Sequence, residues 1–277
     1  MATFRWQNIK DIRTLINVLK YMFSNLDSKN VKRLDFRETH ITESEEHFIV
    51  YDDFLYQVLA ETYTPWILNT GIRPQSSDPA IISGTSLGAI RYTTGLSPGG
   101  AISDDGSQLV CHIPMQCERG NMVFESRLRI NTAVTGISVN VGFTDKTTLE
   151  EPFTIASGDI ITSHASDGVC FVYDTDADTD EIFACAVNNN TDDTENGSTG
   201  FMPVADECMI LRIEIPIDGT NIKFYINSNL VKTLNGGGID PTANLYGTIV
   251  VCNTGAVQKF VDSDYIFFRV NREISSC

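Results

Sequence analysis

The chain has 277 residues and a formal net charge of −16 at pH 7. This acidic balance excludes nucleic acid as a partner, because phosphate binding requires a basic surface. Hydrophobic residues make up 42% of the chain, yet no apolar run approaches the ~18 residues of a membrane-spanning helix, so no membrane association is expected. The first residues show no basic segment followed by an apolar one, which predicts synthesis in a cytoplasm without a signal peptide.

Near the N-terminus, apolar residues recur at alternating spacings of three and four. They are Ile9, Ile12, Ile16, Leu19, Phe23 and Leu26. This spacing is the a/d seam of a left-handed coiled coil, and isoleucine at successive a and d positions favours three strands. A short amphipathic helix packed on its own domain shows the same spacing and is the alternative. We expect an oligomerisation segment that forms a homotrimer.

The spacing of apolar residues from Phe48 to Leu59 is again compatible with a helix face. We therefore expect residues 1–72 to form an N-terminal helical region for oligomerisation and anchoring. Residues 73–79 are polar and contain two prolines, which predicts a linker. Residues 80–277 form the second expected unit.

From residue 80 onward the dominant pattern is a period of two. Apolar and polar residues alternate in 122–130, 137–143, 211–217, 222–226 and 266–270, as they do in half-buried strands. Turn-forming clusters at 218–221 and 235–238 separate some of these segments. Many short alternating strands predict two antiparallel sheets packed face to face.

The seven cysteines form no C-x-x-C pair and leave an odd count, so a disulfide framework is not expected. Cys170 and Cys252 lie within apolar strand-like runs. A free thiol in such a run behaves as a small buried hydrophobic group. We expect both to be buried in the sandwich.

The segment 222–231, preceded by 211–215, resembles the paired strands of concanavalin A-like (laminin G-like) jelly rolls. Ser228 replaces the usual turn glycine, which leaves Asn229 to supply any left-handed conformation. Segments 124–128, 141–145, 167–174 and 264–268 follow the same order of elements. Together, over about 120–270, they resemble the concanavalin-like domains of tailed-bacteriophage structural proteins.

The resemblance implies a mainly β fold: a concanavalin A-like antiparallel β-sandwich (jelly roll) preceded by the helical, coiled-coil segment. It also implies a virion location, with the major capsid protein or other virion proteins as partners. Residues 1–70 hold 8 Lys/Arg against 10 Asp/Glu, so most of the net charge lies after residue 70. We expect the nearly neutral N-terminus to dock on the particle and the acidic sandwich to project outward.

No sign of catalysis is found in the sequence. Concanavalin-like glucanases use a Glu-x-Asp-x-(x)-Glu strand to place two carboxylates on one face, and this chain has no such run; Glu125, Glu214 and Asp218 occur singly. We expect a protein that is not an enzyme and has no cofactor.

One acidic run is a candidate metal site. Asp174, Asp176, Asp178 and Asp180 alternate along the chain, and alternate carboxylates can converge on calcium. The run lacks the glycine and the final glutamate of an EF-hand loop. It lies between two strand-like segments, so we expect a solvated hairpin tip, with calcium as the alternative.

Two functions remain open. The first is a non-enzymatic virion component, either a capsid decoration protein or a head fibre, anchored as a trimer. The second is a tail-associated carbohydrate or receptor-binding protein that recognises host-surface glycans. The acidic loops carry Asp and Asn but few aromatic residues, which favours the first.

Overall fold

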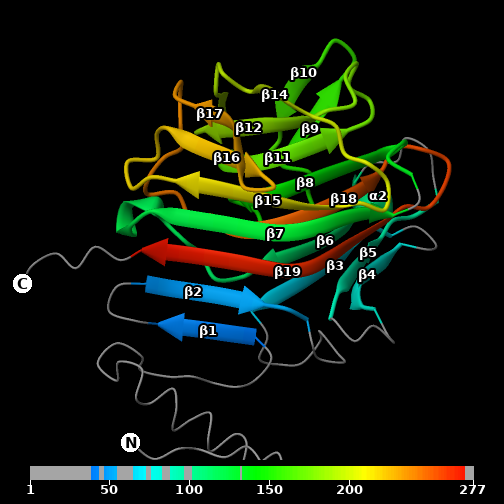
Figure 1. Ribbon diagram of the computed structural model, residues 1–277, viewed down its shortest axis with the longest axis horizontal. Helices are drawn as coiled ribbons and strands as arrows, with labels where there is room; N and C mark the ends of the chain where they lie inside the picture. The colour runs from blue at the N-terminus through cyan, green and yellow to red at the C-terminus, as the bar shows by residue number, and fades with distance from the viewer. Residues whose placement is uncertain are drawn as a thin grey trace, which may run out of the picture.

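The computed structural model of the protein describes residues 39–43, 47–54, 65–72, 76–82, 88–96, 102–131 and 133–271. Within these ranges the chain forms two large antiparallel sheets that pack face to face (Figure 1). The predicted coiled-coil seam, residues 9–26, lies outside the described residues, so the homotrimer stays a prediction. No helix in the described part is long and apolar enough to cross a membrane.

Sheet A has nine described strands in the order β1–β2–β19–β7–β15–β16–β17, with β5 also paired to β19 and β4 paired to β5. Their bounds are β1 Thr39–Glu43, β2 His47–Asp52, β4 Ser77–Ile81, β5 Ile90–Thr93, β7 Met122–Asn131, β15 Cys208–Ile215, β16 Ile222–Ile226, β17 Asn229–Leu234 and β19 Phe260–Asn271.

Sheet B has eight described strands in the order β13–β12–β11–β8–β18–β6–β3, with β14 paired to β12. Their bounds are β3 Trp66–Thr70, β6 Ser107–Cys111, β8 Ile137–Thr144, β11 Gly168–Asp174, β12 Ile182–Asn188, β13 Thr191–Asp192, β14 Gly197–Phe201 and β18 Tyr246–Asn253. Two short helical turns, α2 (Ile102–Asp105) and the 3-10 turn η2 (Cys117–Arg119), flank β6 along the chain.

The period-of-two strands are confirmed, and they explain the core. In β7, Phe124, Leu128 and Ile130 are buried between the sheets, while Glu125 and Arg127 face outward. Aromatic rings from both sheets meet at the centre. The ring centroid of Phe124 lies 5.3 Å from that of Phe268 and 5.8 Å from that of Phe143. Burying these rings supplies much of the packing between the sheets.

The predicted domain boundaries differ from the structure. Strand β2 pairs with β19 and β3 pairs with β6, so the sandwich already includes residues before 72. Strand β4 crosses the stretch expected to be a linker. Trp66 packs against Phe54 and Phe268, and its indole N–H donates to Asp52 Oδ2 over 2.6 Å. Residues 48–52 are a strand rather than a helix, because pairing with β19 outweighs the local helical spacing.

A separate hairpin of β9 (Phe153–Ala156) and β10 (Ile160–Ser163) lies over the outer face of sheet B. It buries Phe153 and Ile155 against Cys170, Val172 and neighbouring residues in a second, smaller core. Cys170 and Cys252 are both buried, as predicted. Burial raises the pKa of the Cys170 thiol well above its ordinary value, so this thiol stays protonated and unreactive at neutral pH.

The turn between β16 and β17 corrects one expectation. Ile226 pairs with Asn229, so the two turn residues are Asn227 and Ser228, with φ of 50° and 67°. Two positive φ values in succession define a type I′ turn. Asn229, which was expected to supply the left-handed conformation, is instead the first residue of β17. Ser228 takes that role without the conformational freedom of a glycine.

Candidate functional site

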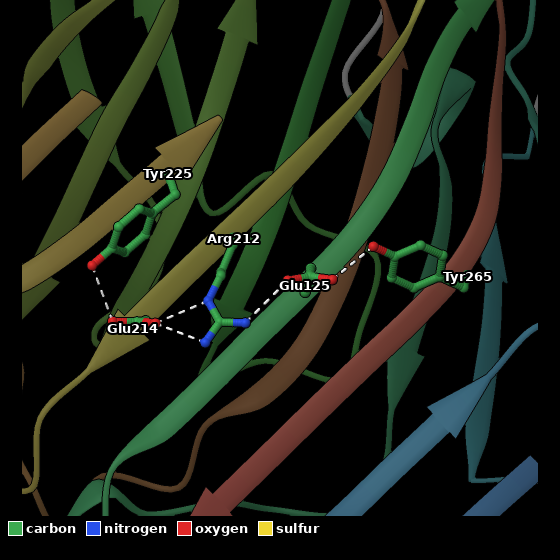
Figure 2. Close-up of polar contacts among 5 residues, drawn as sticks. All are labelled: Glu125, Arg212, Glu214, Tyr225 and Tyr265. Carbon is green, nitrogen blue, oxygen red and sulfur yellow. Dashed lines mark hydrogen bonds and ion pairs between the residues drawn. The ribbon is translucent and has the colours of Figure 1, made fainter. Parts of the chain in front are cut away.

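The outer face of sheet A carries a network of five polar side chains, which we call the central network: Glu125, Arg212, Glu214, Tyr225 and Tyr265. Figure 2 shows that they come from four adjacent strands, β19, β7, β15 and β16. Strand register brings them together: Glu125 lies opposite Arg212, which lies opposite Tyr225. Opposed residues in antiparallel strands share one face of the sheet.

Arg212 is the centre of the central network. Its Nη1 donates to Glu125 Oε2 over 3.1 Å, and its Nε and Nη2 both donate to Glu214 Oε1, over 2.9 and 2.7 Å. The two tyrosine hydroxyls complete the set (Figure 2). Tyr265 donates to Glu125 Oε1 over 2.7 Å, and Tyr225 donates to Glu214 Oε2 over 3.2 Å. Every carboxylate oxygen of the two glutamates therefore accepts a hydrogen bond.

The central network is held at the boundary between protein and solvent. The side chains of Arg212, Glu125 and Glu214 are 32%, 25% and 33% exposed. Burial alone would lower the pKa of Arg212, but its hydrogen bonds to Glu214 and Glu125 raise it above the ordinary value. Partial burial and the contact with Glu125 raise the pKa of Tyr265. At neutral pH Arg212 therefore stays charged and the hydroxyl of Tyr265 stays protonated.

Aromatic and apolar side chains surround the central network. The ring of Tyr51 on β2 lies 6.1 Å from that of Tyr265, centroid to centroid. On the other side, Leu230 of β17 lies opposite Tyr225 and is 54% exposed. The result is a row of half-exposed rings beside charged hydrogen-bonding groups.

A second ion cluster fixes the far end of the same face. The buried carboxylate of Asp262 accepts hydrogen bonds from Arg91 and Arg129, over 2.7 to 2.9 Å. Burial alone would raise the pKa of Asp262, but these guanidinium groups hold it below its ordinary value. Each arginine comes from a different strand that neighbours β19, so the cluster ties β5, β19 and β7 together.

The acidic run is confirmed as a hairpin tip between β11 and β12. Asp174 is buried and accepts the backbone N–H groups of Ile155 and Asp176, whereas Asp176, Asp178 and Asp180 are exposed. Since Asp174 faces the β9–β10 hairpin, it does not converge with the other three. Among the described residues no group of three or more His, Cys, Asp or Glu side chains is placed to hold a metal ion. The expectation of no cofactor stays a prediction, with calcium as its alternative.

Sequence reasoning found Glu125 and Glu214 only as single acidic residues, and the structure places both on the outer face of sheet A. It treated them as isolated, and the structure brings them together through Arg212. Arg212, Tyr225 and Tyr265 were not singled out, because each occupies an ordinary outward position in an alternating strand. The predicted oligomerisation residues, 9–26, lie outside the described residues.

No protein-family model matches the chain, and no curated protein matches it. Solved structures match its fold. A protein of unknown function from Shewanella oneidensis MR-1 is 12% identical, with a TM-score of 0.54; the match covers 100% of this chain and 99% of that one. A LamA variant from Zobellia galactanivorans, in complex with laminaritriose and laminaritetraose, is 10% identical, with a TM-score of 0.54 and coverage of 79% and 97%.

Peanut lectin is 8% identical, with a TM-score of 0.53 and coverage of 82% of this chain and 99% of the lectin. At such low identities the likeness concerns the fold alone. It confirms the expected antiparallel β-sandwich, while the N-terminal coiled coil and a phage origin stay predictions. The described residues have the fold of a concanavalin A/lectin-like jelly-roll β-sandwich.

Proposed function

We propose that the protein is a carbohydrate-binding module and that the central network with its flanking rings is the binding surface. The observation that carries the proposal is the arrangement of Tyr225, Tyr265 and Tyr51 beside two glutamates joined by Arg212. Sequence reasoning found too few aromatic residues in the acidic loops. The rings lie on the sheet instead.

The chemistry of this surface suits a sugar. The apolar face of a pyranose ring can pack on a half-exposed tyrosine ring, and its hydroxyls can bond to carboxylate and guanidinium groups. The charged groups are already held in place by one another, so little side-chain freedom is lost when a ligand binds. Tyrosine and arginine are also the residue types that contribute most binding energy at interfaces.

The same contacts favour binding over hydrolysis. A glycosidase needs one carboxyl that donates a proton and a second carboxylate that acts as nucleophile or base. In the central network all four carboxylate oxygens of Glu125 and Glu214 are engaged by Arg212 or a tyrosine hydroxyl. Neither glutamate is free for this work. We therefore propose a non-enzymatic protein, which should release no reducing sugar from glucans or bacterial polysaccharides.

The test is a glycan array followed by calorimetric titration with the best ligand. Tyr225→Ala should weaken binding by about 1–2 kcal/mol, or roughly five- to thirtyfold. Tyr246 offers a matched control, because it is a half-exposed tyrosine on the outer face of sheet B, where it lies opposite Thr144. Tyr246→Ala should leave the affinity unchanged. Absence of binding to any glycan, or loss of binding in Tyr246→Ala alone, would overturn the proposal.

A second proposal concerns where the protein acts. The heptad spacing of Ile9, Ile12, Ile16, Leu19, Phe23 and Leu26 and the near-neutral charge of residues 1–70 support an N-terminal anchor on a phage particle. The sandwich would then be displayed as a decoration protein, head fibre or tail-associated receptor binder. Deleting residues 1–34 should abolish incorporation into purified virions. Retained incorporation would show that the sandwich is the part that docks.

A further inference from the structure

A pocket of about 230 Å³ opens at one end of the central network. Its lining includes Asn121, Val123, Glu214, Pro216, Lys223 and Arg269. Glu214 belongs to both the pocket and the central network, so the two form one continuous surface. The pocket is smaller than the ~300–1,000 Å³ sites of drug-sized ligands, so it suits one sugar ring or one substituent.

Strand register explains the shape of the pocket. Val123 lies opposite both Arg269 and Glu214, and Glu214 lies opposite Lys223. These residues form a row across β19, β7, β15 and β16, directly beside the row that holds Arg212. The short side chain of Val123 makes the floor. With strands about 4.8 Å apart, the backbones of Arg269 and Lys223 are separated by about 14 Å, and their long side chains stand on opposite sides.

The charges at this pocket are unusual for so acidic a protein. The Nε of Arg269 is sealed from solvent and has no hydrogen-bond partner among the described residues. Lys223 is exposed, and no ion pair joins it to another described residue. The carboxylate of Glu214 is paired with Arg212 at 2.7 Å, and Arg212 is shared with Glu125. No ion pair with another described residue therefore compensates the charge of Arg269 or Lys223, although the net charge of the chain is −16.

We propose that this pocket binds the carboxylate of an acidic sugar, such as a uronic acid. This inference rests on the proposed function and names the substrate class of the same surface. Arg269 lines the pocket, and a guanidinium group forms short, charge-assisted hydrogen bonds to a carboxylate. Glu214 borders the pocket and would repel a doubly charged phosphate more than a singly charged carboxylate. The neighbouring tyrosines would hold the next sugar of the chain.

The test follows the Nε–H resonance of Arg269 by NMR in 15N-labelled, full-length protein. The resonance is assigned by its loss in Arg269→Gln. Methyl glucuronoside should shift it in a saturable manner in the millimolar range, whereas the neutral methyl glucoside should not. Arg269→Gln should weaken glucuronoside binding, followed on backbone resonances of β7, by about tenfold or more. Lys223→Gln should weaken it roughly threefold, and the control Lys146→Gln should not weaken it.

The possible failures are distinguishable. If the glucuronoside gives no saturable shift, or the glucoside gives an equal one, the acidic-sugar inference is overturned, while the glycan array still decides the proposed function. If the glucuronoside binds at Arg269 in a protein that binds no oligosaccharide, the anion pocket stands and its link to carbohydrate recognition fails. Weaker binding at higher ionic strength should accompany the expected result, because the pocket attracts its ligand through charge.

Discussion

Glu151 should make the protein less stable as the pH rises from about 4.5 to about 7. It lies just before β9, in the segment that crosses the outer face of sheet B, and its Oε1 is sealed from solvent. Burial, aided by the charges of Asp174 and Asp176, raises its pKa from 4.5 to about 7, although the hydroxyl of Ser138 opposes the rise. Glu151→Gln removes the ionisation and keeps the size of the side chain.

The direction of this pH dependence follows from whether the folded or the unfolded state releases the proton of Glu151 at the lower pH. The unfolded chain loses it near pH 4.5 and the folded protein near pH 7. The free energy of unfolding therefore falls between these values and is level above them. A separation of about 2.5 pH units corresponds to about 3 kcal/mol, at about 1.36 kcal/mol for each unit. Glu151→Gln does not lose this stability. Its free energy of unfolding should therefore exceed that of the natural protein by near zero at pH 4 and by about 3 kcal/mol at pH 8.

Urea unfolding of both proteins across this pH range measures the difference directly, and taking the difference cancels the titration of groups such as Asp262. Glu207→Gln is the control, because Glu207 is exposed and its substitution should give a curve parallel to that of the natural protein. Parallel curves for Glu151→Gln as well would refute the reasoning. They would mean that Glu151 is hydrated or paired in solution.

Four further predictions concern packing, the turn, metal and assembly. A methyl group on Gly247 would overlap the ring of Phe268, so Gly247→Ala should lower the free energy of unfolding by about 1–3 kcal/mol in urea titrations. Ser228→Gly should raise it by about 1 kcal/mol, because glycine adopts the left-handed conformation without strain. A chelator should leave the melting temperature unchanged if the acidic hairpin tip binds no calcium; a drop of several degrees would identify a metal site. Ile12→Asp with Ile16→Asn should reduce a trimer to a monomer in light scattering, while the melting temperature of the sandwich stays the same.

The sequence by itself determined the strands after residue 120. Alternation of apolar and polar residues predicts a half-buried strand because successive side chains point to opposite faces. Because this rule depends only on neighbouring residues in the chain, the sequence was sufficient to locate β7, β8, β15, β16 and β19. It also predicted which side of β7, β15, β16 and β19 would be buried, and that Cys170 and Cys252 would be buried. Strand β8 was expected to be half-buried, but both of its sides are buried.

Local pattern was insufficient where long-range pairing decides the structure. Residues 48–52 have helical spacing but form β2, because they add a strand to the edge of β19. Trp66 was assigned to a separate N-terminal region, yet it lies against Phe268, about two hundred residues away in the chain. The register of β16 with β17 decides that Asn227 and Ser228 are the turn residues. A shift of that register by one residue would place other residues in the turn.

The candidate site was decided by tertiary structure alone. Arg212 contacts Glu125 across 87 positions of sequence, and Tyr265 contacts Glu125 across 140. Each of these residues, taken in its own strand, is an ordinary outward-facing polar residue. Only the order of strands in sheet A places β19, β7, β15 and β16 side by side. Because hydrogen bonds between strands set that order and register, side chains that are unrelated in sequence become neighbours on one face.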